Sequence, residues 1–131
     1  MKKIILLFVI IICIISCYDI AYVGISDRYI GTFKSREPIL GSGYDKYLYL
    51  NIRSGGATIY FAPDGFNQDV TEVPGYEHIA YSNFIGDGNV YNLYNSDYSC
   101  KLVFRSDNQV EVTMKGQGIF NLENVICDKI N

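Results

Sequence analysis

The sequence contains one histidine, no tryptophan, and no apolar run long enough to cross a bilayer as a helix. The longest such run, residues 4–15, has twelve residues, whereas a transmembrane helix needs about 20. The single histidine, His78, follows Glu77 at the start of a predicted strand, an arrangement typical of an ordinary surface residue. The Gly-x-Ser-x-Gly, phosphate-loop and His-Glu-x-x-His patterns are missing. We therefore expect a protein that is not an enzyme, with no catalytic residues and no cofactor.

Metal and nucleic-acid binding have little support either. Asp64, Asn67 and Asp69 bring oxygen atoms to one loop, but their spacing differs from that of a helix–loop–helix calcium site. Turn formation explains these residues equally well, so we expect no metal. The formal charge of the chain is −3, and an acidic surface disfavours nucleic acid because the phosphate backbone is negative.

The first seventeen residues have the order of a secretory signal. Lys2 and Lys3 precede the apolar run, and the small residue Ser16 lies directly before Cys17. The segment Ile14-Ile15-Ser16-Cys17 resembles the lipobox of bacterial lipoproteins, whose cysteine sulfur is lipidated before the chain is cut at that cysteine. The alternative is an ordinary secretory peptide in which Cys17 has no special role.

This resemblance implies a lipoprotein of the cell envelope, outside the cytoplasm. Its acyl chains, palmitate among them, on Cys17 would anchor it to a bacterial membrane, the outer membrane or the cell surface. We predict a signal peptide at 1–16, a lipidated N-terminus and tether at 17–28, and one domain at 29–131. Loss of Lys2 and Lys3 with the leader changes the formal charge from −3 to −5.

The rest of the chain alternates apolar and polar residues in short segments separated by turns. In 46–53, Leu48, Leu50 and Ile52 fall on one face of a strand, and Tyr47 and Tyr49 fall on the other. No segment shows a sustained helical period. The pattern predicts about eight strands, at 29–35, 46–53, 57–62, 78–84, 89–94, 99–105, 109–115 and 119–127.

Short connections favour pairing of each strand with the next one along the chain. We therefore predict an all-β fold, a small antiparallel up-and-down barrel of about eight strands, with a β-sandwich as the alternative. The segment Tyr29-Ile30-Gly31-Thr32-Phe33-Lys34 resembles the Gly-x-Trp first strand of lipocalin-like barrels, with Phe33 in the place of the tryptophan. That resemblance implies a calyx for a small apolar molecule.

Tyrosine is abundant, with twelve in the chain. Tyr47 and Tyr49 would form an aromatic stripe on the face opposite Leu48 and Leu50. If the stripe is exposed, it is a candidate recognition surface, because tyrosine offers a large contact area at low entropic cost. The alternative is that the rings pack across strands and stabilise the sheet.

Two cysteines, Cys100 and Cys127, remain once Cys13 leaves with the leader and Cys17 takes the lipid. An oxidising compartment favours a disulfide between them. A tight meander separates them, however, because it places them at opposite ends of the strand at 109–115, and bridged Cα atoms must lie within about 7 Å. Both a disulfide and a pair of buried thiols stay open at this point.

These observations favour a membrane-anchored lipoprotein whose barrel is a non-catalytic binding module for a small apolar ligand or a protein partner. The alternative is an inhibitor of a basic host enzyme such as lysozyme. Bacterial lysozyme-inhibitor lipoproteins are likewise small, acidic and β-rich, and their inhibitory Ser-Gly-x-x-Tyr loop is approximated by Ser42-Gly43-Tyr44-Asp45-Lys46-Tyr47, with one extra residue.

Overall fold

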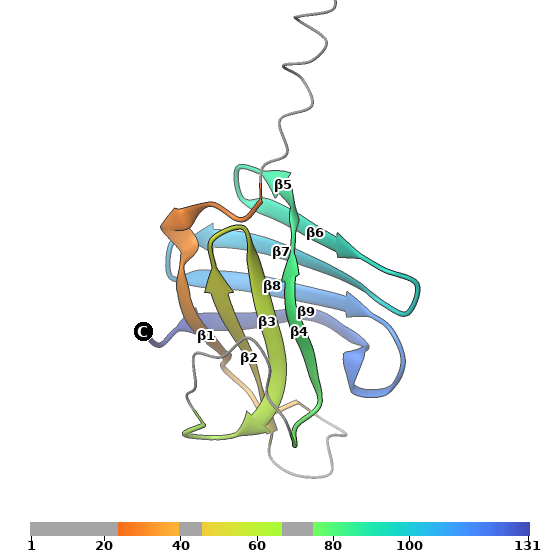
Figure 1. The fold of residues 1–131 in the computed structure, drawn as a ribbon. Helices are drawn as coiled ribbons and strands as arrows, with labels where there is room; N and C mark the ends of the chain where they lie inside the picture. Colours follow the sequence, from red (N-terminus) through yellow and green to blue (C-terminus); the bar gives the residue numbers. More distant parts are fainter. Residues whose placement is uncertain (1–23, 40–45, 67–74) are drawn as a thin grey trace, which may run out of the picture.

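A computed structural model describes residues 24–39, 46–66 and 75–131 of the chain. It shows an all-β protein (Figure 1). The strands are β1 (Gly31–Ser35), β2 (Lys46–Arg53), β3 (Gly56–Pro63), β4 (His78–Asn83), β5 (Ile85–Asp87), β6 (Val90–Tyr94), β7 (Ser99–Ser106), β8 (Gln109–Lys115) and β9 (Leu122–Lys129). Two short 3-10 helices accompany them, η1 (Asp27–Tyr29) and η2 (Gly118–Phe120). Within these residues no helix has the length and apolar content to span a bilayer.

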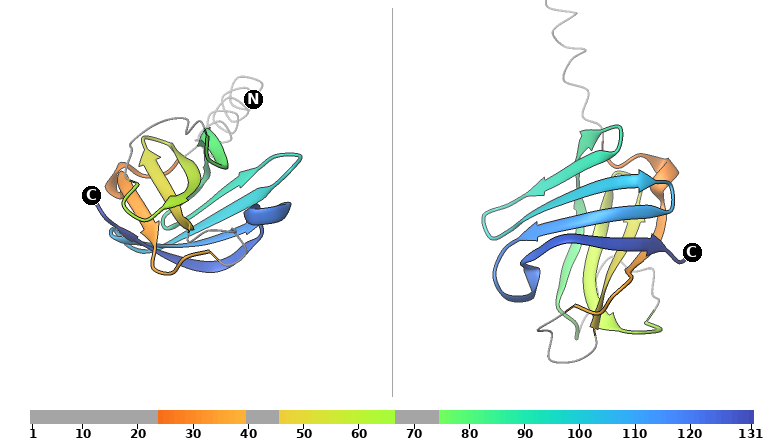
Figure 2. Two further views of the ribbon diagram at one scale, coloured as in Figure 1. Left: turned by 90° about the horizontal axis from the view of Figure 1, so that it is seen from below. Right: turned by 180° about the vertical axis from the view of Figure 1, so that it is seen from behind.

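All nine strands belong to one antiparallel sheet with the order β4-β3-β2-β1-β9-β8-β7-β6-β5. Every strand pairs with its sequence neighbours except at β4 and β5, and β1 pairs with β9 to join the two ends of the chain. The sheet curls into a nearly closed barrel (Figure 2). The predicted barrel is therefore confirmed, and the sandwich alternative is wrong.

The sheet stays open between β4 and β5, which follow each other directly in the chain. Phe84, the residue between them, is buried in the core, and its N–H donates to the carbonyl of Gly55 over 3.1 Å. The side chain of Phe84 thus packs inside the barrel at the point where two strands fail to pair.

The predicted inner faces are confirmed. Alternate residues along β2, β3, β7 and β8 point into one core, which is what a period of two requires of a barrel strand. Examples are Leu50 on β2, Phe104 on β7 and Val112 on β8, all buried. The eight predicted strands all exist, and β5 is a ninth that is too short to show alternation. The last strand spans Leu122–Lys129 rather than the predicted 119–127, because Gly118–Phe120 forms a 3-10 helix.

Side chains fill the interior of the barrel. Twenty buried residues of the described ranges form one continuous core. Inside it, the rings of Phe33 and Tyr91 each meet the ring of Phe104 edge-to-face. A barrel of this strand number is just wide enough for side chains to occupy its interior. This packing disfavours the predicted calyx for a small apolar ligand.

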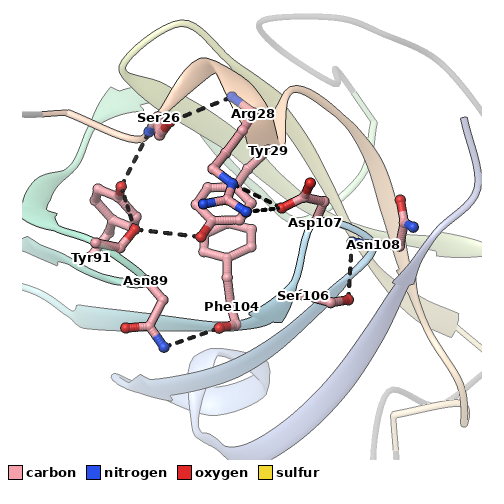
Figure 3. Close-up of polar contacts among 10 residues, drawn as sticks. Ser26, Arg28, Tyr29, Asn89, Tyr91, Phe104, Ser106, Asp107 and Asn108 are labelled. Atoms are coloured by element: carbon pink, nitrogen blue, oxygen red, sulfur yellow. Dashed lines mark hydrogen bonds and ion pairs between the residues drawn. The ribbon is translucent and has the colours of Figure 1, made fainter.

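Residues 24–30 close one end of the barrel, and we call them the N-terminal plug (Figure 3). Ile25 and Tyr29 are only 2% and 4% exposed and belong to the core. The main chains of Ile25 and Gly55 exchange two hydrogen bonds, so the plug touches the β2–β3 turn. The approach is close, since a Cβ on Gly24 would lie 2.7 Å from the Gly55 Cα.

Polar contacts hold the plug from the other side. The Tyr91 hydroxyl donates to the Gly88 carbonyl over 2.9 Å and accepts from the Ser26 N–H over 3.3 Å (Figure 3). Arg28 forms an ion pair with Asp107 in the β7–β8 turn. The predicted boundary between tether and domain at residue 29 therefore needs correction, because residues 24–28 are part of the domain. Sequence alternation missed them because a plug makes no strand.

Candidate functional site

A groove of about 510 Å³ lies between residues 36–39, which follow β1, and residues 121–126 of β9 and its approach. We call it the β9 groove. It opens where the pairing between β1 and β9 ends. Their pairing covers Phe33↔Lys129 to Ser35↔Cys127, and one further bond runs from the Arg36 N–H to the Ile126 carbonyl over 3.1 Å.

Local chemistry explains why the chain separates from β9 here while it stays beside β2. The Ser35 hydroxyl accepts from the Leu48 N–H over 3.0 Å and donates to the Glu37 carbonyl over 2.9 Å, which curls the chain at the strand end. Pro38 has no N–H to offer a sheet ladder and restricts the residue before it. The Ile39 N–H then donates to the Lys46 carbonyl, which holds this segment beside the first residue of β2.

The facing part of β9 has a β-bulge. Its register against β8 shifts between Val112 and Met114, and Asn124 adopts a left-handed conformation with φ of 52°. Asparagine tolerates this region better than most residues. The Thr113 hydroxyl accepts from the Asn124 N–H over 3.2 Å and holds the bulge in place. Among the described residues, Leu122–Val125 have a strand beside them only on the β8 side.

The floor of the groove is apolar and its rim is acidic. Pro38, Ile39, Leu122 and Val125 supply the apolar surface. On the rim, Glu37 and Glu123 are exposed carboxylates. The groove therefore offers apolar contact surrounded by negative charge.

The one basic residue of the groove is neutralised. Two nitrogens of the Arg36 guanidinium donate to the Asp128 carboxylate, Nε to Oδ2 over 2.6 Å and Nη2 to Oδ1 over 3.0 Å. This hydrogen bonding lowers the pKa of Asp128 below its ordinary value. Gln109 Nε2 also donates to Asp128 Oδ1 over 3.3 Å. Because Arg36 is engaged in this way, the charge of the two glutamates on the rim is not balanced from within the groove.

The predicted recognition surface at Tyr47 and Tyr49 is wrong for Tyr49, which is 1% exposed. Its ring stacks on that of Tyr60 with centroids 5.1 Å apart, and its hydroxyl donates to the Pro63 carbonyl over 3.1 Å. Tyr47 is half-buried and lies under Lys34, whose Nζ is 4.2 Å from the ring centroid. The alternative considered for these rings, packing across strands, is what the structure shows.

These rings belong to an outer aromatic cluster on the outside of β2 and β3. Tyr60 touches Phe66, whose ring lies 4.8 Å from that of Tyr76 across the β3–β4 connection. Lys34 forms an ion pair with Asp64 at the edge of the cluster. Burial raises the pKa of Tyr49. Sequence alternation left open whether this face is exposed, because it cannot show that Phe66 and Tyr76 pack against the rings of a neighbouring strand.

Cys100 and Cys127 are two separate buried thiols. Cys100 lies opposite Met114 and Cys127 opposite Val110, so they occupy different levels of β8. Burial raises the pKa of Cys100 to about 12 and raises that of Cys127 as well. A thiol that cannot ionise is a poor nucleophile. The sequence left open a disulfide or two buried thiols, and the structure has two buried thiols.

The other residues singled out in the sequence are Cys17, the Ser42–Tyr47 segment and His78. Cys17 and most of the Ser42–Tyr47 segment lie outside the described residues. His78 Nδ1 lies 2.9 Å from the Tyr76 carbonyl oxygen. In the described ranges, no group of three or more histidine, cysteine or acidic side chains is arranged to hold a metal ion.

Sequence reasoning missed the β9 groove. The one local signal is Glu37-Pro38, which marks the end of the first strand. Nothing local indicates that residues 121–126 lie across from it. Comparisons of the chain with protein-family models, with curated proteins and with solved structures found no match. We therefore infer function from the residues of the molecule itself.

Proposed function

We propose that this protein is a lipid-anchored, non-catalytic binding protein of the bacterial cell envelope whose ligand is a protein partner. The partner would place an extended, basic segment in the β9 groove. The observation that carries this proposal is a groove with an apolar floor and two carboxylates, those of Glu37 and Glu123, that have no basic partner in the groove. The groove lies where the edge of β9 is no longer paired with β1.

The packed interior favours a protein over a small apolar molecule. Core residues such as Phe33, Leu50 and Phe104 already occupy the space that a lipocalin-like calyx would leave empty. A ligand would therefore bind the outside of the barrel. Extended segments commonly bind beside strand edges, where main-chain hydrogen bonds give affinity and side-chain pockets give specificity.

The position of the groove suits an anchored protein. The described chain begins at Gly24, at the end of the barrel that the plug closes, while residues 36–39 lie at the opposite end (Figure 2). With the lipid on Cys17, six residues lie between the anchor and Gly24, and the extended chain from Cys17 to Gly24 has a reach of roughly 25 Å. The plugged end would face the membrane, and the groove would face away from it toward a partner.

Binding of peptides of graded charge tests this proposal. The lipidated protein in detergent is titrated with extended decapeptides that alternate valine with lysine, glutamine or glutamate. We expect the lysine series to bind and the double variant Glu37→Lys/Glu123→Lys to bind it about tenfold more weakly. Asp97→Lys/Asp87→Lys is the matched control, since it makes the same change in net charge away from the groove.

Two results would contradict the proposal. Equal weakening in both double variants would show that only the overall charge of the protein matters. Unchanged binding in the groove variant would place the peptide elsewhere on the surface.

A second candidate is inhibition of a basic enzyme such as lysozyme. The acidic rim of the groove supports it, and residues 40–45, which contain most of the lysozyme-inhibitor-like segment, follow directly after Ile39. Lysis of bacterial cell walls by lysozyme, followed as loss of turbidity, tests it. We expect inhibition that Glu37→Lys relieves; an unchanged rate of lysis at excess lipoprotein would exclude this candidate.

A further inference from the structure

The outer face of β6, β7 and β8 carries a second hollow of about 380 Å³, which we call the two-lysine hollow. Most of its lining residues are strand residues whose side chains point away from the core, and the buried Cys100 lies beneath them. Its main lining residues are Asn92, Tyr94, Lys101, Thr113, Lys115 and Asn124. None of the residues that line it is acidic, although the chain as a whole has more acidic than basic residues.

The strand register places its two lysines close together. Lys101 lies opposite Thr113, and Lys115 lies two residues further along the same strand, opposite Ser99. Lys101 and Lys115 are therefore diagonal neighbours on one face, at a Cα separation of about 7–8 Å. Two ammonium groups so placed repel each other unless an anion lies between them.

The two lysines also differ from the other basic residues of the described chain. Four of these form ion pairs with carboxylates, as Arg105 does with Glu111, and Lys129 lies over the Phe33 ring. Lys46 and Arg53 have partners as well. Among the basic side chains of the described residues, only those of Lys101 and Lys115 have no ion pair, hydrogen bond or ring contact. In the described part of the chain, two basic side chains without a partner therefore lie side by side in one hollow.

The other lining groups suit a ligand that has hydroxyl groups. Tyr94 is 71% exposed and presents its ring to solvent beside the lysines. Asn92 lies opposite Lys101 on β6 and has an amide that can donate and accept. The Asn124 Oδ1 accepts from the Thr113 hydroxyl over 3.3 Å, so the amide N–H groups of Asn124 are available to a ligand.

We propose that the two-lysine hollow binds an acidic oligosaccharide. Its carboxylate or sulfate would lie between Lys101 and Lys115, a sugar ring would lie against the Tyr94 ring, and its hydroxyls would bond Asn92 and Asn124. Charge-assisted hydrogen bonds to two ammonium groups supply the attraction, and the aromatic ring supplies contact area with little loss of entropy. This site shares Asn124 with the β9 groove, but its proposed ligand does not depend on the function proposed for that groove.

Isothermal titration of the mature lipoprotein in detergent tests the proposal with three probes. These are an oligomer of uronic acid, a heparin-derived hexasaccharide and a neutral dextran oligomer. We expect binding of the first or second probe and none of the third. Lys101→Gln or Lys115→Gln should weaken binding about tenfold, and Tyr94→Ala should weaken it as well.

Arg28→Gln is the matched control because it removes one positive charge from an exposed ion pair at the barrel end. Equal loss in Arg28→Gln and Lys101→Gln would overturn the proposal in favour of general charge attraction. Absence of binding to both acidic probes would overturn it, as would binding that is insensitive to Tyr94→Ala. A further arm uses phosphatidylglycerol vesicles; lysine-dependent binding to these, without binding to the oligosaccharides, would identify a lipid phosphate as the ligand and overturn the assignment to sugar.

Discussion

The ring of Tyr29 stacks on the ring of Phe104 with centroids 3.8 Å apart and planes 12° from parallel. Tyr29 comes from the N-terminal plug and Phe104 from β7, so the two rings lie 75 positions apart in the sequence. The stacking closes the end of the barrel and continues the core into a segment that forms no strand. It makes the plug a structural part of the domain.

Tyr29→Ala should therefore lower the free energy of unfolding by about 3–5 kcal/mol, the range for loss of a large buried ring. Chemical denaturation followed by circular dichroism measures the change. Tyr94→Ala is the control, because Tyr94 is exposed, and its effect should stay within about 0.5 kcal/mol. An effect of Tyr29→Ala as small as that of the control would show that the plug is not packed in solution.

Tyr49 should act through stability rather than recognition. Tyr49→Ala removes the stack on Tyr60, and we expect a loss of about 3–5 kcal/mol. Tyr49→Phe keeps the ring and loses only the hydrogen bond to Pro63, at a cost of about 0.5–1.5 kcal/mol. Burial raises the pKa of Tyr49 in the folded state. The stability that the neutral, buried phenol contributes is therefore fully present below the unfolded-state pKa of about 10, and it is lost as the pH rises through the folded-state pKa. Wild type should lose more stability above pH 10 than Tyr49→Phe does; parallel curves would contradict the burial.

The ion pair of Arg36 and Asp128 should appear in the acid limb of the stability curve. The pKa of Asp128 is lowered in the folded state by its hydrogen bond from Arg36. Its stabilising contribution is therefore present above about pH 4 and lost as the pH falls through the folded-state pKa. Asp128→Asn should flatten the curve below pH 4 relative to Asp97→Asn, a change at an exposed residue of the β6–β7 turn. Denaturation midpoints between pH 2 and pH 6 measure the difference, and identical acid limbs would refute it.

Cys100 and Cys127 should be unreactive in the folded protein and free once it unfolds. Burial raises the pKa of Cys100 to about 12, so almost no thiolate exists at neutral pH. In the proposed mature form, which lacks Cys13 and has its Cys17 sulfur lipidated, a thiol reagent should find no reactive group in the native, unreduced protein and two after denaturation. Finding none after denaturation would show a disulfide and a different course for β9.

Lipidation at Cys17 remains a prediction from Ile14-Ile15-Ser16-Cys17. Cys17→Ser should abolish incorporation of labelled fatty acid and leave the unprocessed precursor, while Cys100→Ser should leave both labelling and processing unchanged. Mass spectrometry of the N-terminal peptide measures processing directly. Labelling that persists in Cys17→Ser would place the acyl chain elsewhere.

The strands were predictable because alternation is a local property. A residue pair such as Leu48 and Leu50 reports its common face within a few positions, and turn residues such as Gly55 mark where a strand ends. The inner faces of four strands followed from this pattern alone. The short strand β5 did not, since three residues are too few to show a period.

The β9 groove was beyond this kind of reasoning. It requires β1 to pair with β9 and then to diverge after Ser35, and these two strands lie at opposite ends of the domain sequence. The bulge at Asn124 has no distinctive sequence pattern either, because asparagine occurs equally well in turns. Lys101 and Lys115 could be placed on one face, but their lack of carboxylate partners depends on which residues the fold brings near.

By itself, the sequence determined the class of fold, the number and position of the longer strands, and the residues that face the core, because the backbone pleat makes each strand display its two faces in order. Only the tertiary structure decided that the barrel closes through β1 and β9, that Tyr49 is covered on the outside, and that residues 24–30 plug one end. These features depend on contacts between residues far apart in the chain, whose free energy is not encoded in any local period.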